Sequence, residues 1–254
     1  MGRGKHPIRR VAGQSASPKP AQSYLLSHKR TDFEGVKQLQ IYNRLYKAFG
    51  PQHWWPAESR FEVIVGAILT QNTSWKNVEK AQKSLKEKAM LDPEKLYHIP
   101  QNKLAMLIRS SGFYNIKARR LKAFMTFLYD EYDGSLDRMF EEEADLLREK
   151  LLFVKGLGPE TVDSILLYAG DKPYFVVDAY TRRVFSRHSL VSEKASYAEM
   201  QTFFMKRLPL DVSLFNEYHA LIVSVGKLFC KTIPDCENCP LGDLLEKEDC
   251  GSAF

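Results

Sequence analysis

Apolar residues recur at helical spacing along most of the chain after residue 31. Within residues 32–49 they lie three or four positions apart until Gly50-Pro51 ends the run. Similar patterns predict further helices over about 61–70, 76–88, 103–110, 116–131, 143–153, 160–169, 179–187, 196–207 and 214–229. Only residues 174–177 have the composition of a strand, and four residues without a hairpin partner make no sheet. The sequence therefore predicts an all-α protein.

Composition and charge narrow the class of protein. Of the 254 residues, 44% are hydrophobic and 27% are charged, which is typical of a globular chain with a proper core. The longest apolar runs are much shorter than the ~20 residues that span a bilayer, so we expect no membrane protein. No apolar segment follows the first arginines as in a secretory signal, which predicts a cytoplasmic location.

The positive charge is concentrated at the N-terminus. Residues 1–30 hold seven of the 37 Lys and Arg residues and no acid, while the remaining 30 basic residues face 31 acidic ones. Such a tail can bind a polyanion such as nucleic acid without reading its sequence. It can equally be a solvated, disordered leader. We expect residues 1–30 to be disordered and leave both roles open.

A glycine-rich turn separates two of the predicted helices. The segment Lys155-Gly156-Leu157-Gly158 is followed by Pro159, a residue that the first turn of a helix tolerates. Two glycines around an apolar residue allow a turn to present backbone N–H groups at the start of the next helix, where a phosphate oxygen can bind. This order of elements is the helix-hairpin-helix, which holds the DNA backbone independently of sequence. The alternative is a simple connection between two helices.

Asp178 follows the apolar run 174–177 and precedes a predicted helix. In that place we expect it to be the N-cap of the helix. Backbone N–H groups and the positive helix end keep an N-cap carboxylate ionised. Twenty residues after the second hairpin glycine, such a carboxylate is suited to act on a nucleotide. The alternative is a purely structural cap.

Together these segments resemble the helix-hairpin-helix DNA glycosylases of the endonuclease III superfamily. The likeness extends to Ala67–Trp75 and to Ser111–Ala118, and it covers about residues 36–240. Trp54-Trp55-Pro56, the Leu-Thr-Gln-Asn-Thr run and Ser-Gly-Phe-Tyr-Asn are most similar to the 3-methyladenine DNA glycosylase III branch. The resemblance implies two helical lobes with duplex DNA in the cleft. The lobes would be residues 56–165, which include the hairpin, and residues 31–55 joined to 166–254.

The same resemblance implies roles for individual residues. Asp178 matches the catalytic aspartate, which stabilises a cationic sugar and assists water. Bifunctional members have a lysine at the position of Glu160, and a glutamate cannot form their imine intermediate. We therefore expect a glycosylase without strand-cleaving activity. Gln71 and Phe113 match residues that fill the space of a flipped nucleotide, and the hairpin of Lys155, Gly156, Leu157 and Gly158 would contact phosphate.

Aromatic residues match the base pocket of that branch. Trp54, Trp55, Pro56 and Trp75 fall at these positions, and Lys227 aligns with a pocket lysine. Flat apolar walls stack on a flipped base, and indole rings favour a cationic methylated purine. The alternative for Trp54 and Trp55 is a role as core anchors.

All four cysteines lie near the C-terminus, as Cys230, Cys236, Cys239 and Cys250. In a cytoplasmic chain such a cluster indicates metal binding, and its spacing admits either zinc or an iron–sulfur cluster. The resemblance favours a structural [4Fe–4S] cluster. However, the last interval is ten residues where the superfamily usually has five, and some members of the branch have no cluster.

These observations predict a DNA repair enzyme of base excision, acting as a monomer on double-stranded DNA that contains a damaged base. The expected reaction is hydrolysis of the N-glycosidic bond of an alkylated purine of the 3-methyladenine type. One alternative is an endonuclease III-like glycosylase for oxidised pyrimidines or mismatches. A second is a non-catalytic DNA-binding module with an iron–sulfur centre.

Overall fold

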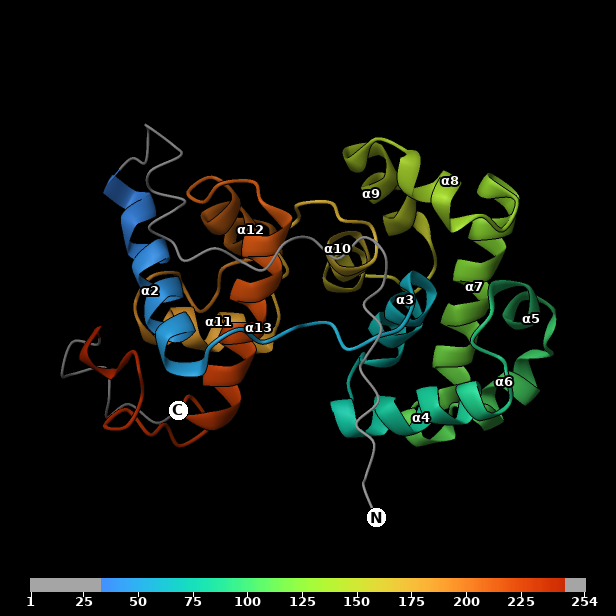
Figure 1. The fold of residues 1–254 in the computed structure, drawn as a ribbon, viewed down its shortest axis with the longest axis horizontal. Coiled ribbons are helices and arrows are strands. Elements are labelled where there is room, and N and C mark those ends of the chain that lie inside the picture. The colour runs from blue at the N-terminus through green and yellow to red at the C-terminus, as the bar shows by residue number, and fades with distance from the viewer. Residues whose placement is uncertain (1–32, 245–254) are drawn as a thin grey trace, which may run out of the picture. The chain divides into compact units, whose positions relative to one another are not determined.

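The computed structural model describes residues 33–244, and within them every regular element is a helix (Figure 1). This confirms the all-α prediction. The basic segment 1–30 and Cys250 lie outside the described residues. The described chain divides into two compact units, which are residues 55–157 and residues 33–54 with 158–244. No helix among the described residues is long and apolar enough to cross a membrane.

The first unit, residues 55–157, is built around one long helix. Helix α7 contacts α3, α5, α6, α8 and the short 3₁₀ helix η1. The helices of this unit are α3 (Arg60–Leu69), α4 (Trp75–Glu87), α5 (Pro93–His98), α6 (Gln101–Leu107), η1 (Arg109–Ser111), α7 (Tyr114–Tyr132), α8 (Leu136–Glu141) and α9 (Ala144–Phe153). Helix α3 is buried along its whole length after its first residue, because its residues are apolar except Glu62, which is paired with Lys86 over 2.7 Å.

The sequence prediction missed two helices of this unit, α5 and α8. Each has six residues, too few for an apolar repeat to stand out. Both begin at a side-chain cap, where Asp92 accepts the Lys95 N–H and Ser135 accepts the Arg138 N–H. The capping residues were therefore the available signal for these helices. Helix α6 also ends earlier than predicted, and η1 takes the place of its expected last turn.

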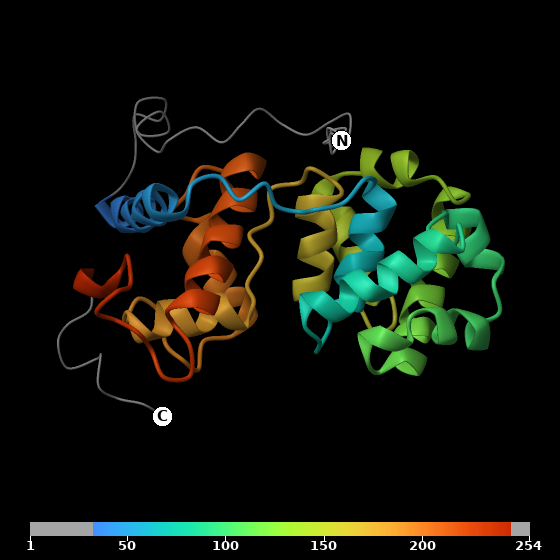
Figure 2. The ribbon, with the colours of Figure 1, turned by 60° about the horizontal axis from the view of Figure 1, so that its bottom comes forward.

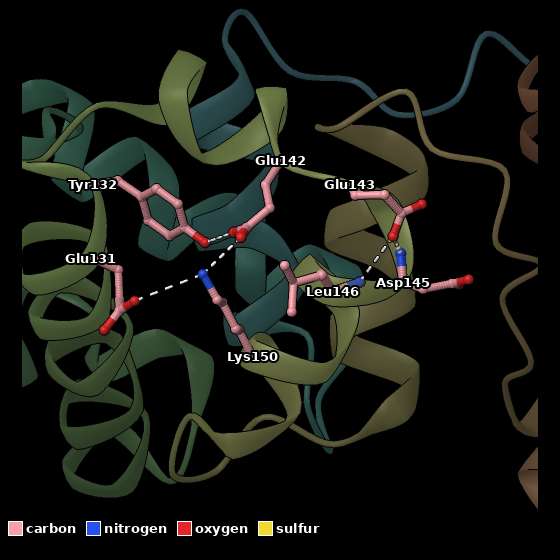
Figure 3. A network of polar contacts seen from close by, with 7 residues as sticks. All are labelled: Glu131, Tyr132, Glu142, Glu143, Asp145, Leu146 and Lys150. Carbon is pink, nitrogen blue, oxygen red and sulfur yellow. Dashed lines mark hydrogen bonds and ion pairs between the residues drawn. The ribbon is translucent and has the colours of Figure 1, made fainter.

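A polar network fixes α9, which leads into the glycine turn (Figure 3). Lys150 donates to Glu142 over 2.7 Å and lies 3.8 Å from Glu131, while the Tyr132 hydroxyl also donates to Glu142. Burial and the neighbouring Glu142 raise the pKa of Tyr132 to about 12, so this hydroxyl remains a donor. At the other side of the network, Glu143 caps α9 by accepting the N–H groups of Asp145 and Leu146. The start of α9 is thereby held to the end of α7.

The second unit packs around α13 (Val212–Leu228), beside which α2 (Phe33–Phe49) and α11 (Ala179–Arg187) lie (Figures 1 and 2). Helix α10 (Pro159–Tyr168) also contacts α13. Helix α12 (Tyr197–Met205) and the 3₁₀ helix η2 (Gly242–Leu244) complete this unit. Its core is rich in aromatic rings. Phe175 is stacked on Phe204 with ring centroids 3.9 Å apart, and it meets the edges of other core rings.

The strand-like segment 174–177 is extended and buried but belongs to no sheet. Side chains of α12 satisfy its backbone instead. Gln201 donates to the Phe175 carbonyl over 2.8 Å, and the Val177 N–H donates to the Tyr197 hydroxyl over 3.5 Å. Both side chains also donate to the buried carboxylate of Asp163. This arrangement brings the chain to Asp178 along a fixed path, because buried backbone groups need such partners.

Candidate active site

The glycine turn follows α9 and precedes α10. Gly158 is the N-cap of α10, and Pro159 occupies its first turn as expected. Gly156 has a φ of +93°, and a Cβ there would lie 2.5 Å from Cγ of Arg120. Glycine is therefore required at this position, because the positive φ disfavours other residues and because a side chain would have no room beside Arg120. Lys155, Gly156 and Gly158 are exposed, whereas Leu157 is buried and anchors the turn.

Gln71 is joined to this turn inside the first unit. Its amide donates to the Gly156 carbonyl over 3.2 Å, and its side-chain oxygen accepts from Arg120. The residue matched to a nucleotide-filling role is thus linked directly to the predicted phosphate-binding turn. The structure places these two sequence-predicted features side by side.

Phe113 lies on a second loop of the same unit. It is 65% exposed and has a left-handed backbone with φ +46°, immediately before α7. An exposed phenyl ring on a constrained backbone is suited to contact a nucleic acid base. The nearby Lys117 is buried and donates to the carbonyls of Leu69 and Ser111 over 2.8 and 2.6 Å. One ammonium group thereby ties the Gln71 loop to the Phe113 loop.

Lys117 makes the free energy of unfolding depend on pH. Burial, and then the charge of Arg120, lower the pKa of Lys117 to about 8. In the unfolded chain the pKa is about 10.4, so between pH 8 and 10.5 the unfolded state binds more protons. The free energy of unfolding should therefore rise with pH across this window by on the order of 2–3 kcal/mol from this residue.

Lys117→Met should remove that rise in urea-unfolding measurements at pH 8 and 10.5. The control Lys103→Met, at an exposed lysine of α6, keeps Lys117 and should retain the wild-type difference. If the free energy of unfolding depends on pH equally in Lys117→Met and in the wild type, the lowered pKa of Lys117 is contradicted.

Asp178 is the N-cap of α11, as predicted, and one oxygen of its carboxylate is held by hydrogen bonds. Oδ1 accepts from the N–H and the hydroxyl of Thr181 over 2.7 and 2.9 Å. Oδ2 lies 3.6 Å from Nε2 of His219 on α13. Burial alone would raise the pKa of Asp178, but His219 and Thr181 outweigh it, so the pKa lies below its usual value. The carboxylate is ionised at neutral pH.

Glu160 lies in the first turn of α10, within the same unit as Asp178. Desolvation raises the pKa of Glu160, as does the charge of Asp178, while His219 lowers it. The two carboxyl groups therefore influence each other electrostatically. A pocket of about 650 Å³ opens beside them, a volume typical of small-molecule sites. Its lining includes Val177, Asp178, Glu160 and Tyr197.

Trp54 reaches the same group of residues. Burial, and then the charges of Asp178 and Glu160, raise the pKa of Tyr168 well above its usual value, and Trp54 lowers it. The segment before Trp54 is fixed to α13, because the Gln52 N–H donates to Glu217 over 2.7 Å and Ser224 donates to the Gln52 side chain. Within this unit the structure brings together three sequence-predicted residues, Trp54, Glu160 and Asp178.

The surroundings of the other predicted pocket residues are as follows. Trp55 is buried in the first unit, where its ring is 5.0 Å from that of Trp75 in an edge-to-face contact. A Cβ on Gly66 would approach Trp55 to 3.1 Å, so Trp55 packs closely on α3. Pro56 is exposed. Lys227 is exposed in the last turn of α13, with Nζ 5.9 Å from the Tyr180 ring centroid. Their roles as pocket walls stay predictions.

The cysteine loop follows α13 directly. Cys230, Cys236 and Cys239 line one small pocket together with apolar residues that include Val184 and Leu241. Arg187 donates to the Cys230 sulfur over 3.4 Å, and the Leu241 N–H donates to the Cys239 sulfur over 3.5 Å. Such donors stabilise thiolates, the form in which cysteine binds soft metals. Among residues 33–244, no three Cys, His, Asp or Glu side chains are placed to hold a single metal ion.

Sequence reasoning missed Tyr168, Thr181 and His219 as members of the site. His219 directly follows the polar residues Asn216, Glu217 and Tyr218 in α13, so its position in the sequence has no distinguishing spacing. Thr181 had a usable signal, because N3 is the residue whose N–H an N-cap side chain accepts. Tyr168 becomes a neighbour of His219 only through the packing of α10 on α13.

Comparison with known proteins defines the class. Residues 65–210 match the family model of the HhH-GPD superfamily of base excision DNA repair proteins. The chain belongs to this superfamily, and it is a DNA glycosylase of the endonuclease III-like type. The predicted family is confirmed.

Three relatives illustrate the similarity. A protein of Methanocaldococcus jannaschii with a provisional description as a DNA repair glycosylase is 49% identical over 215 residues, 84% of this chain and 96% of its own. The H. pylori 3-methyladenine DNA glycosylase bound to 1,N6-ethenoadenine has a TM-score of 0.67 at 32% identity, covering 75% of this chain and 97% of that one. An endonuclease III–DNA complex has a TM-score of 0.72 at 26% identity, covering 85% and 96%.

Proposed function

We propose that this glycosylase hydrolyses the N-glycosidic bond of an alkylated purine, of the 3-methyladenine type, flipped out of duplex DNA. The observation that carries the proposal is the ionised Asp178 carboxylate, fixed by Thr181 and His219 in the unit that also holds Trp54 and Glu160. The similarity to the H. pylori enzyme, whose solved complex holds a modified adenine, supports this substrate class.

Asp178 can stabilise the reaction electrostatically. As the glycosidic bond breaks, positive charge develops on the sugar, and a preformed carboxylate next to it lowers the barrier. Because Oδ1 already accepts two hydrogen bonds, Oδ2 is the oxygen that can guide an incoming water. A cationic alkylated base leaves without further protonation, so one carboxylate is sufficient for this chemistry.

Glu160 supports hydrolysis without strand cleavage. The imine route to strand cleavage needs an amine nucleophile, and a carboxylate at the start of α10 supplies none. We infer a monofunctional enzyme that leaves an abasic site in the DNA. Gln71 and Phe113 would fill the space of the flipped nucleotide, and the turn from Lys155 to Gly158 would bind a DNA phosphate. The protein would act on duplex DNA as a monomer.

The direct test is base release from methylated duplex DNA, resolved by chromatography, with the strands analysed in parallel. The proposal expects free 3-methyladenine or 7-methylguanine and intact strands until alkali is added. The similarity to endonuclease III favours one other candidate, a glycosylase for oxidised pyrimidines. Release from an oxidised duplex but not from a methylated one would establish that alternative.

We further propose that Cys230, Cys236 and Cys239, with Cys250, hold a [4Fe–4S] cluster. When bound, such a cluster would cross-link the C-terminal loop and would take no part in the hydrolysis. Arg183 and Arg187 of α11 already tie this loop to the helix that begins at Asp178, by donating to the backbone carbonyls of Cys230 and Lys231. The cluster loop and the catalytic helix would therefore be stabilised together.

Gly242→Ala should abolish cluster retention. A Cβ at Gly242 would lie 2.0 Å from the Cys236 carbonyl oxygen, so the backbone of the loop would have to move. Iron, acid-labile sulfide and zinc should be measured on the isolated protein. Gly158→Ala, where a Cβ meets nothing within 4 Å, should keep the wild-type iron content. Zinc in place of iron in the wild type would overturn the cluster assignment.

A further inference from the structure

Tyr168 is partly buried and His219 is buried, and the mechanism above does not say where the hydrogens of these two side chains lie. The Tyr168 hydroxyl at the end of α10 lies 2.6 Å from Nδ1 of His219. On the opposite edge of the imidazole ring, Nε2 faces Oδ2 of Asp178 across 3.6 Å. The side chains of His219 and Asp178 are only 8% and 15% exposed. Within residues 33–244, His219 Nε2 makes no hydrogen bond of ordinary length.

The neighbours of the imidazole ring dictate where its hydrogen lies. Burial and the charges of Asp178 and Glu160 raise the pKa of Tyr168 well above its usual value, so its hydroxyl keeps the proton and can donate to a bare Nδ1. The carboxylate on the other side is ionised and has no proton to give. A lone pair on Nε2 facing it would be repelled, whereas an N–H is attracted.

We propose that Tyr168 and His219 form a relay that holds a hydrogen on His219 Nε2 and directs it at Oδ2 of Asp178. His219 is then a positioning residue for the carboxylate, and Tyr168 fixes the tautomer of His219. With Thr181 on Oδ1, the carboxylate is oriented from both sides. The 3.6 Å separation shortens when a nucleotide enters, since catalytic hydrogen bonds tighten in the bound complex.

The charged and titratable groups that face the relay are few. Glu160 and Tyr168 come from α10 and Asp178 from the start of α11. On α13 itself, Glu217 is engaged with the Gln52 N–H. Among these groups, Tyr168 is the one in hydrogen-bond contact with the ring, so it is the residue that selects the tautomer.

The tautomer itself can be measured without any substrate. In the full-length protein labelled with ¹⁵N-histidine, two-bond ¹H–¹⁵N spectra distinguish Nε2–H from Nδ1–H, and His219→Gln identifies the signals of this ring. We expect hydrogen on Nε2, with Nδ1 as an acceptor. Hydrogen on Nδ1 with a bare Nε2 would overturn the proposal. This readout is independent of the proposed function.

The catalytic consequence rests on the proposed function and is tested by single-turnover base release from methylated duplex. His219→Leu should slow release about 100-fold and Tyr168→Phe about tenfold, with duplex affinity unchanged within about twofold. His219→Gln can still offer an N–H to Asp178, so it should release base about tenfold faster than His219→Leu. This partial rescue distinguishes positioning from simple packing.

Tyr218→Phe is the matched control. Tyr218 is fully buried and its hydroxyl donates to the Gln38 carbonyl over 2.8 Å, so the variant loses one buried hydrogen bond away from Asp178. It should release base at the wild-type rate. Equal rates for Tyr168→Phe and Tyr218→Phe would refute the relay. A wild type that releases no methylated base would instead refute the proposed function, and the tautomer spectrum would still decide on the relay.

Discussion

Asp178→Asn should reduce the single-turnover rate of base release by at least about 100-fold while the affinity for duplex DNA is retained. The substitution keeps the shape of the side chain and its capping bond to Thr181, because Asn is as good an N-cap as Asp. What is lost is the negative charge opposite the developing cationic sugar. The charge contributes to the transition state and little to ground-state binding, so the rate changes and the affinity does not.

Asp211→Asn provides the control for this experiment. Asp211 is the N-cap of α13 and accepts the Leu214 N–H over 2.8 Å, so the same chemical change is made at another helix start of the same unit. Release by this variant should match the wild type. If Asp178→Asn also matches the wild type, the carboxylate has no catalytic role. If neither variant nor wild type releases a base from methylated or from oxidised duplex but all bind duplex, the protein acts as a non-catalytic DNA-binding module.

Phe175→Ala should lower the free energy of unfolding by about 3–5 kcal/mol. Phe175 is completely buried, stacks on Phe204 and contacts the rings of Phe215 and Tyr218 edge-on. Removing the ring leaves a cavity among rigid aromatic neighbours that cannot close it. Urea unfolding at neutral pH measures the loss. Because residues 174–177 lead directly to Asp178, base release should also decline.

Phe153→Ala is the corresponding exposed-site control. Phe153 is 83% exposed at the end of α9, and its removal should change stability by less than about 0.5 kcal/mol. A loss below about 1 kcal/mol in Phe175→Ala would mean that the aromatic stack is not the centre of this core.

The helical fold and the start of α11 were predictable because their signals are local. Apolar periodicity located the long helices. The order of Val177, Asp178 and Ala179 predicted an N-cap at Asp178, and in the structure the Asp178 side chain accepts the Thr181 N–H. The short helices α5 and α8 were missed, since six residues contain less than two turns of pattern. The motif pairing also identified the family, because widely separated segments had to agree in order and type.

The surroundings of Asp178 could not be predicted in the same way. Tyr168 and His219 are 51 positions apart in the chain, and His219 is 41 positions from Asp178. Neither has a neighbouring residue that marks it as special. Likewise, Gln71 and Phe113 were recognisable separately, but the buried Lys117 that joins their loops has no periodic signature.

The sequence by itself determined the helical class, the family, the cap at Asp178 and the absence of a lysine at position 160. The cap and the helices depend on residue type and on spacing within a few turns of chain, and the family depends on the order of several such short motifs along the sequence. The tertiary structure decided which groups surround the carboxylate and how it is held, through the packing of α10 and α11 on α13. The physical reason is that hydrogen bonds and electrostatic shifts depend on distances in space, and packing sets these distances between residues that the chain keeps far apart.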